Sequence, residues 1–128
     1  MAYNILIVDD SQTMRKVIQK SISLSGFDLW ECCHAANALE ALNLLESHWI
    51  DLILTDFNMP GMNGFEMVHE IRKNEKYATT PVILISTQSS ENIIKEGTTL
   101  GIRGFIKKPF HPESICDLLR QTMENPNV

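Results

Sequence analysis

Three short and nearly continuous apolar runs, each ended by polar or turn residues, constrain the fold of this sequence most strongly. They are NILIV (4–8), IDLIL (50–54) and VILIS (82–86). A strand that is apolar on both faces must be covered on both faces, which is typical of a parallel sheet between layers of helices. Two weaker strand candidates, FDLWECC (27–33) and GFIK (104–107), suit outer positions of the same sheet.

Helical patterns alternate with these five segments. Four helices are predicted from apolar residues that recur at helical spacing, over 11–25, 35–47, 64–74 and 112–124. Ser11 is placed to cap the first helix, and Gly26 is placed to end it. The segment 90–100 is the weakest helix and is expected to be the most mobile, because Gly97 and two threonines disfavour its last turn.

The alternation of strand and helix predicts an α/β fold with a doubly wound, five-stranded parallel sheet, (βα)5 in order along the chain. A chain of 128 residues with 44% hydrophobic residues can bury a core of its own without disulfides or metals. No linker-like or repetitive segment divides the sequence. We therefore expect one domain over residues 1–128, with no output domain after the last helix.

Composition excludes several classes of function. The net charge is −5, with the acidic excess in residues 1–88, so a direct nucleic-acid surface is not expected. No segment is typical of a signal peptide or a membrane span. The three cysteines are odd in number and, like the four histidines, lack metal-ligand spacing, which favours a reducing compartment, the cytoplasm. The histidines are expected at the surface or at helix ends.

Residues that carry chemistry follow four of the predicted strands. Asp9 and Asp10 end the first strand, Asp56 ends the third, Ser86 ends the fourth, and Lys108 follows the fifth. The carboxyl ends of parallel strands share one edge, where ligands bind. Three close carboxylates repel one another, and Mg²⁺, which prefers carboxylate oxygens, compensates for that repulsion. The pattern therefore predicts a magnesium site in which Asp56 is the nucleophile for a phosphoryl group.

Each of these residues, taken alone, has a simpler interpretation. A pair of acids before a helix is usually solvated near the helix N-terminus, and an aspartate before a Pro-Gly segment is commonly a turn residue. A serine at a strand end usually bonds to the backbone, and a lysine pair is usually solvated. Their shared placement at the ends of four strands favours a common site.

Four motifs, in unchanged order, make the chain resemble the receiver domains of two-component response regulators, and in size the single-domain, CheY-like members. The motifs are ILIVDDS, LILTDFNMPGMNGFE, PVILIST and GFIKKPF, and together they span the chain nearly end to end. One such motif alone is weak, whereas the four together are specific. The resemblance implies a flavodoxin-like sheet with strand order 2-1-3-4-5.

The resemblance also implies a mechanism. Asp56 would accept a phosphoryl group from the phosphohistidine of a sensor histidine kinase, from a phosphotransfer protein or from a small phosphodonor. Mg²⁺ would be held by Asp10, by Asp56 and by the main-chain carbonyl of Asn58, with Asp9 acting mostly through water. Such a protein is a signalling phosphoacceptor and not an enzyme, since it promotes only its own phosphorylation and dephosphorylation.

The resemblance further implies a switch. Lys108 would pair with a phosphoryl oxygen and precede a cis proline bond, while Ser86 would bind the phosphoryl group and draw its loop inward. A changed face of the fourth helix, fifth strand and fifth helix would then bind a downstream protein, in chemotaxis or in another pathway. Phe105 occupies the switch position, where relatives more commonly carry tyrosine, and Thr87 replaces a smaller residue beside Ser86.

The sequence leaves three other functions open. An aspartyl-phosphate phosphatase or phosphotransferase of the haloacid dehalogenase type needs an acid two positions after its nucleophile, where this chain has Asn58. A flavin or nucleotide carrier needs a phosphate-binding loop after the first strand, where DDSQTM offers acids. A pseudo-receiver that acts as a non-phosphorylated interaction module is expected to lack some of the acids.

Overall fold

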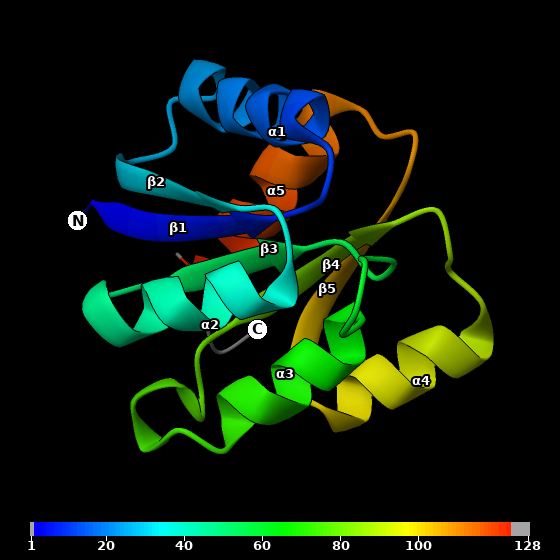
Figure 1. The fold of residues 1–128 in the computed structure, drawn as a ribbon. Coiled ribbons are helices and arrows are strands. Elements are labelled where there is room, and N and C mark those ends of the chain that lie inside the picture. Colours follow the sequence, from blue (N-terminus) through cyan, green and yellow to red (C-terminus); the bar gives the residue numbers. More distant parts are fainter. Residues whose placement is uncertain (1, 124–128) are drawn as a thin grey trace.

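The computed structural model describes residues 2–123, which form a parallel sheet of five strands between two layers of helices (Figure 1). The strands are β1 (Tyr3–Val8), β2 (Leu29–Ala35), β3 (Leu52–Thr55), β4 (Val82–Ser86) and β5 (Ile102–Lys107). Their order in the sheet is β2-β1-β3-β4-β5, and every neighbouring pair is parallel. The predicted fold class and strand order are confirmed.

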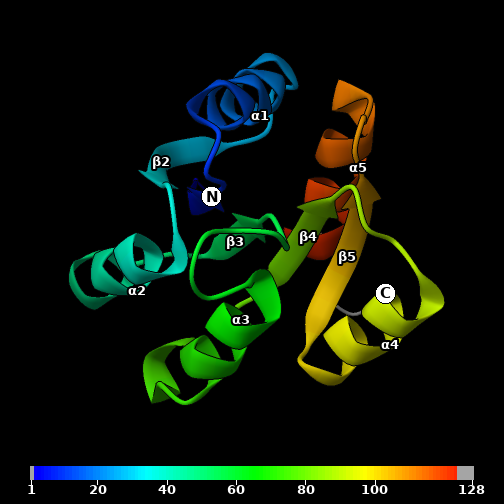
Figure 2. The ribbon, with the colours of Figure 1, turned by 45° about the vertical axis from the view of Figure 1, so that its right-hand side comes forward.

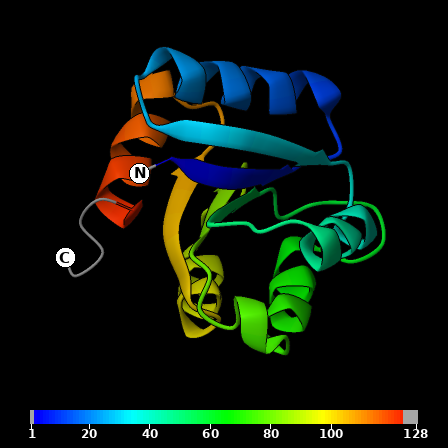
Figure 3. The same ribbon diagram turned by 90° about the vertical axis from the view of Figure 1, so that its left-hand side faces the viewer.

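Within residues 2–123, five α-helices, one after each strand, cover both faces of the sheet (Figures 1 and 3). The helices are α1 (Gln12–Leu24), α2 (Ala38–Ser47), α3 (Gly64–Arg72), α4 (Glu91–Thr99) and α5 (Pro112–Met123), and a 3-10 turn, η1 (Glu75–Tyr77), follows α3. Helices α1 and α5 lie together on one face, and α2, α3 and α4 lie on the other. Among residues 2–123, no helix has the length and apolarity needed to cross a bilayer.

The boundaries differ most from prediction around β2 and α2. Strand β2 extends to Ala35, which pairs with Val8 of β1, and α2 begins only at Ala38. The side chain of Asn37 explains this start, because its oxygen accepts a hydrogen bond from the main-chain N–H of Glu40 at 2.9 Å. An N-cap of this kind competes with continued strand and fixes the first residue of the helix.

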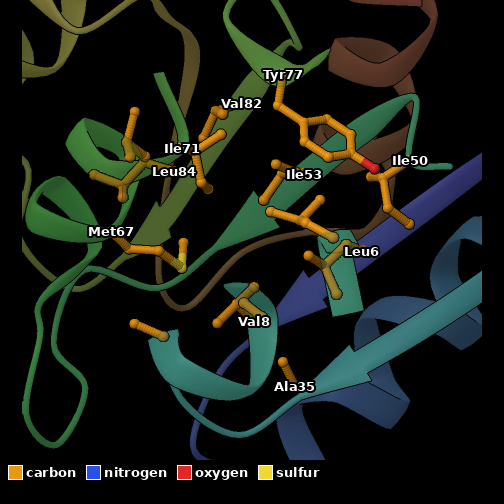
Figure 4. Close-up of a cluster of buried hydrophobic side chains, with 14 of the residues drawn as sticks. Leu6, Val8, Ala35, Ile50, Ile53, Met67, Ile71, Tyr77, Val82 and Leu84 are labelled. Atoms are coloured by element: carbon orange, nitrogen blue, oxygen red, sulfur yellow. The ribbon is translucent and has the colours of Figure 1, made fainter. Parts of the chain in front are cut away.

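Alternate residues of the central strand β1 belong to two separate apolar clusters, one on each face of the sheet. Leu6 and Val8 pack beneath α2 and α3, and the ring of Tyr77 closes the same cluster (Figure 4). Ile5 and Ile7 face α1 and α5. All four aliphatic side chains are at most 1% exposed, and each contributes about 1.5–3 kcal/mol through its burial. The two clusters hold the layers in place and so fix the positions of the strand ends.

The carboxyl ends of the strands meet at one edge, which Figure 2 brings toward the viewer. The segment 90–100, predicted to be the weakest helix, forms α4, and Ser90 caps it by accepting a hydrogen bond from the main-chain N–H of Ile93 at 3.3 Å. Gly97 lies inside this helix rather than ending it. The mobility of α4 stays a prediction.

Candidate functional site

Three carboxylates converge where β1 and β3 end, as the sequence predicts. One carboxylate oxygen each from Asp9, Asp10 and Asp56 lies within 4.8 Å of the others. Asp9 is only 2% exposed, Asp56 is half-buried, and Asp10 is exposed to solvent. The acidic cluster therefore extends from the interior of the protein to its surface, where ligands can reach it.

The ammonium group of Lys108 links the two inner carboxylates of this cluster. Its Nζ atom lies 2.8 Å from Oδ2 of Asp9 and 3.3 Å from Oδ2 of Asp56. Burial alone would lower the pKa of Lys108, but the hydrogen bond to Asp9 and the charges of Asp56 and Asp9 outweigh burial and raise it. Lys108 is therefore fully charged at neutral pH.

Asp56 is held by its neighbours with one oxygen aimed at the cluster. Its Oδ1 atom accepts a hydrogen bond from the main-chain N–H of Phe57 at 2.7 Å, which leaves Oδ2 facing Lys108. Burial raises the pKa of Asp56, and the charge of Asp9 raises it further, against the opposing effects of Lys108 and of the Phe57 N–H group. Keeping the Asp56 carboxylate ionised therefore costs free energy, and a bound cation would reduce that cost.

Gly64 allows the loop after Asp56 to return close to the strand end. A Cβ atom at this position would lie 2.6 Å from the main-chain oxygen of Asp56, and the N–H of Gly64 donates to the carbonyl of Phe57 at 2.8 Å. Sequence reasoning placed this glycine in a motif but gave it no role. Its position at the start of α3 was the signal that could have revealed this role.

Asp9 has two supports that sequence reasoning also missed. Its Oδ1 atom accepts a hydrogen bond from the main-chain N–H of Ser11 at 2.9 Å, and its carbonyl accepts one from Nη1 of Arg15 at 2.6 Å. Arg15 lies near the start of α1, five positions after Asp10, and this spacing was the available signal. The two contacts hold the innermost carboxylate in position.

Ser86 and Lys108 are joined through the backbone at the ends of β4 and β5. The main-chain N–H of Lys108 donates to the carbonyl of Ser86 at 2.8 Å, and the buried hydroxyl of Ser86 accepts a hydrogen bond from the main-chain N–H of Gln88 at 3.1 Å. Thr87, which lies between Ser86 and Gln88 in the loop after β4, is exposed. The bond between Lys108 and Pro109 is cis, as predicted.

The donor set of the cluster fits Mg²⁺. Three carboxylates and one ammonium leave two negative charges, which equal the charge of one divalent ion. The donors are hard oxygens, and exposed Asp10 leaves room for the waters that Mg²⁺ retains. Asn58 is exposed in the loop after Asp56. The role of its carbonyl as a ligand stays a prediction.

Phe105 lies outside the cluster and packs against α4. Its ring is half-buried on the α2–α3–α4 side of the sheet. Gly97 makes the contact possible, because a Cβ atom there would lie 2.8 and 2.9 Å from Cε2 and Cζ of Phe105. Gly97 has a low helix propensity, but its lack of a side chain makes room for the ring of Phe105.

Replacing Gly97 by alanine is expected to displace the Phe105 ring while changing stability little. Alanine favours the helix by about 1 kcal/mol, and the added methyl group meets the far end of a side chain that can rotate. Aromatic NMR spectra should show shifted Phe105 ring resonances, with those of Tyr3 and Phe27, which stack together, unchanged. Unshifted Phe105 resonances would contradict the packing role of Gly97.

Comparison with known proteins agrees with this geometry. Residues 5–120 match the response regulator receiver domain family. The chain is 32% identical to a chemotaxis protein CheY homolog of Campylobacter jejuni over 120 residues, covering 93% of this chain and 91% of the relative. It is also 32% identical to the chemotaxis protein CheY of Pseudomonas aeruginosa over 123 residues, covering 96% and 98%.

The solved structures give the same result. The crystallised chemotaxis protein CheY4 of Vibrio cholerae superimposes with a TM-score of 0.87 at 32% identity, covering 96% of this chain and all of that one. A receiver domain protein of Methanospirillum hungatei, 23% identical with a TM-score of 0.85, shares the fold. With the sequence match, the strand order and the acidic cluster in agreement, this chain belongs to the response regulator receiver domain family.

Proposed function

We propose that this protein is a phosphoacceptor of two-component signalling and that Asp56 is the residue phosphorylated. The observation that supports this most directly is the pairing of Asp56 Oδ2 with Lys108 at 3.3 Å, inside a cluster that also contains Asp9 and Asp10. A carboxylate nucleophile next to a fixed ammonium group and a divalent-cation site has what phosphoryl transfer requires. A histidine kinase or a phosphotransfer protein is the proposed donor.

Each residue of the site has a proposed role in the transfer. Asp10, Asp56 and the carbonyl of Asn58 would hold Mg²⁺, which, when bound, would supply the charge that offsets the phosphoryl oxygens. Asp56 Oδ2 forms the new O–P bond as the P–N bond of the donor phosphohistidine breaks, and the imidazole leaves with the electron pair. Lys108 then moves its hydrogen bonds from the carboxylates to the phosphoryl group.

The proposed output is a shift between two conformations of the surface formed by α4, β5 and α5. The hydroxyl of Ser86 donates a hydrogen bond to the phosphoryl group, which pulls exposed Thr87 and its loop toward Asp56. The ring of Phe105, in contact with α4, changes position with that loop. A downstream protein that prefers the second conformation is thereby recruited, and the domain acts as a signalling module rather than a turnover enzyme.

The test is phosphorylation of the purified protein by acetyl phosphate with Mg²⁺, followed by intact mass measurement. We expect a mass gain of one phosphoryl group, lost in Asp56→Asn and on chelation of Mg²⁺. Asp117→Asn, an exposed position on α5, is the matched control and should be labelled like wild type. Label that survives Asp56→Asn would refute the assignment, and repeated turnover of the donor would indicate a phosphatase or phosphotransferase.

A further inference from the structure

A second group of metal-ligating side chains lies between β2 and the end of α2, apart from the acidic cluster. One ligand atom each from Glu31, Cys33 and His48 lies within 4.8 Å of the others. Glu31 and Cys33 are two positions apart on one strand, so their side chains point to the same face of the sheet. His48 follows the last turn of α2, which packs on that face. Figure 3 shows β2 at the upper edge of the sheet, beside β1.

We propose that Glu31, Cys33 and His48 form a binding site for a divalent transition metal, with Zn²⁺ as the ion that fits best. A thiolate, an imidazole and a carboxylate are the donors that Zn²⁺ takes in proteins, whereas Mg²⁺ and Ca²⁺ require oxygen donors. The thiolate and the carboxylate together neutralise the ion. Three protein ligands leave a fourth, tetrahedral position for water. The site does not depend on phosphorylation of Asp56.

The hydrogen bonds of His48 favour the tautomer that this role requires. Its Nδ1 atom lies 3.2 Å from the carbonyl of Leu44 and 2.9 Å from the hydroxyl of Ser47. Because a carbonyl can only accept, the contact with Leu44 favours the tautomer with the proton on Nδ1, which leaves on Nε2 the lone pair that a metal needs. Histidine ligands characteristically donate their other N–H to a carbonyl in this way. The hydroxyl of Tyr77 donates to the carbonyl of His48 and fixes the backbone there.

The geometry requires only small side-chain movements. Metal–ligand distances of about 2.0–2.3 Å place the donors of a tetrahedral site roughly 3.3–3.8 Å apart. Cys33 is fixed by the core, with 8% exposure, whereas Glu31 is exposed and His48 is half-buried. Rotation of these two side chains closes the site around the fixed sulfur. The Cys33 thiol of the metal-free protein lies beside the Glu31 carboxylate, and its proton passes to solvent when the metal–sulfur bond forms.

The neighbouring cysteine and histidine provide matched controls. Cys32 and His34 lie on the opposite face of β2, toward α1. Both ring nitrogens of His34 are engaged, one by Nε of Arg15 at 3.3 Å and the other by the side-chain oxygen of Gln19 at 2.5 Å. Variants of Cys32 and His34 therefore change the same residue types on the same strand and leave the proposed site intact.

The experiment is a titration of the metal-free full chain with Co²⁺, in the presence of a non-chelating reductant and enough Mg²⁺ to saturate the acidic cluster. We expect one Co²⁺ per chain, with a thiolate-to-cobalt charge-transfer band and the visible absorption of tetrahedral cobalt, both removed by added Zn²⁺. Cys33→Ser should abolish the band. His48→Gln and Glu31→Gln should each weaken Co²⁺ binding by at least roughly tenfold, because a direct ligand is lost.

The control variants separate cobalt bound at Cys33 from cobalt bound at the opposite face of β2 or at the acidic cluster. Cys32→Ser, His34→Gln and Asp56→Asn should keep the band, and circular dichroism should show that every variant is folded. Glu31→Gln, at an exposed position, keeps the test valid if Cys33→Ser does not fold. A wild-type spectrum without a thiolate band overturns the proposal, as does a band that survives Cys33→Ser or Co²⁺ binding that is lost only in Asp56→Asn.

Discussion

Lys108→Met is expected to lower the free energy of unfolding of the metal-free protein by about 3 kcal/mol, the lower end for breaking a buried ion pair. The lower end applies because one side of the cluster is open to solvent at Asp10. In wild type the ammonium group lies 2.8 Å from Asp9 and 3.3 Å from Asp56. Without it, two inner carboxylates face each other uncompensated, and the melting temperature should fall by about 10 °C.

The same substitution should tighten Mg²⁺ binding. The charge of Lys108 repels any cation bound to Asp10 and Asp56. Two unit charges at 4 Å interact by about 1 kcal/mol in water and about 4 kcal/mol at a protein-like dielectric, and the double charge of Mg²⁺ makes each value about twice as large. A tenfold lower Kd, equal to about 1.4 kcal/mol, is thus the smallest change expected. Saturating Mg²⁺ should therefore restore much of the stability that Lys108→Met removes.

Lys107→Met is the matched control for this prediction. Lys107 is adjacent to Lys108 in sequence but is exposed, so its replacement should change the free energy of unfolding by less than about 1 kcal/mol. Because the pKa of Lys108 is raised, its contribution is fully present below the unfolded-state value and is lost only as pH rises through the folded-state value. Urea unfolding at neutral pH, with EDTA or with Mg²⁺, therefore measures all of it. Equal effects of the two substitutions would contradict the prediction.

The sequence predicted the fold well because its strongest signals came from buried strands. The continuous runs around Ile5, Ile53 and Ile83 were recognisable without tertiary information, since only a doubly covered strand is apolar on both faces. The edge strand β2 was placed less accurately, because Trp30 and Glu31 face solvent and its pattern is mixed. Its end was set by Asn37, a local cap with a weak sequence signal.

The acidic site was predictable for a topological reason. Asp9, Asp56 and Lys108 follow strands, and a parallel sheet brings all strand ends to one edge wherever the helices lie. Their pairing needs no detail of side-chain packing. By contrast, the histidines were assigned surface or helix-end roles because no metal-ligand spacing was found. The proximity of His48 to Cys33 depends on how α2 packs on β2, which spacing along the chain does not encode.

Asp56→Asn should affect stability in opposite directions with and without Mg²⁺. Wild type with Mg²⁺ at a hundred times its Kd should gain about 2.7 kcal/mol in free energy of unfolding by ligand linkage. The variant, which lacks a charged ligand, should gain much less. In EDTA at neutral pH, however, the variant should be the more stable protein, because it no longer has to keep a half-buried carboxylate ionised beside Asp9.

The pH dependence of this second effect follows from the direction of the pKa shift. The folded-state pKa of Asp56 is raised above its ordinary value of 3.8, so the folded protein binds that proton more tightly than the unfolded chain. The stability due to Asp56 is therefore lost as pH rises from the ordinary pKa of the carboxyl to its raised folded-state pKa. Above the folded-state pKa, the ionised group destabilises the fold. The advantage of Asp56→Asn in EDTA should be largest at neutral pH and disappear in acid below the ordinary pKa. Urea unfolding across this range measures the difference. An advantage that grows in acid would mean that Lys108 compensates Asp56 completely, and the site would then have no electrostatic need for a cation.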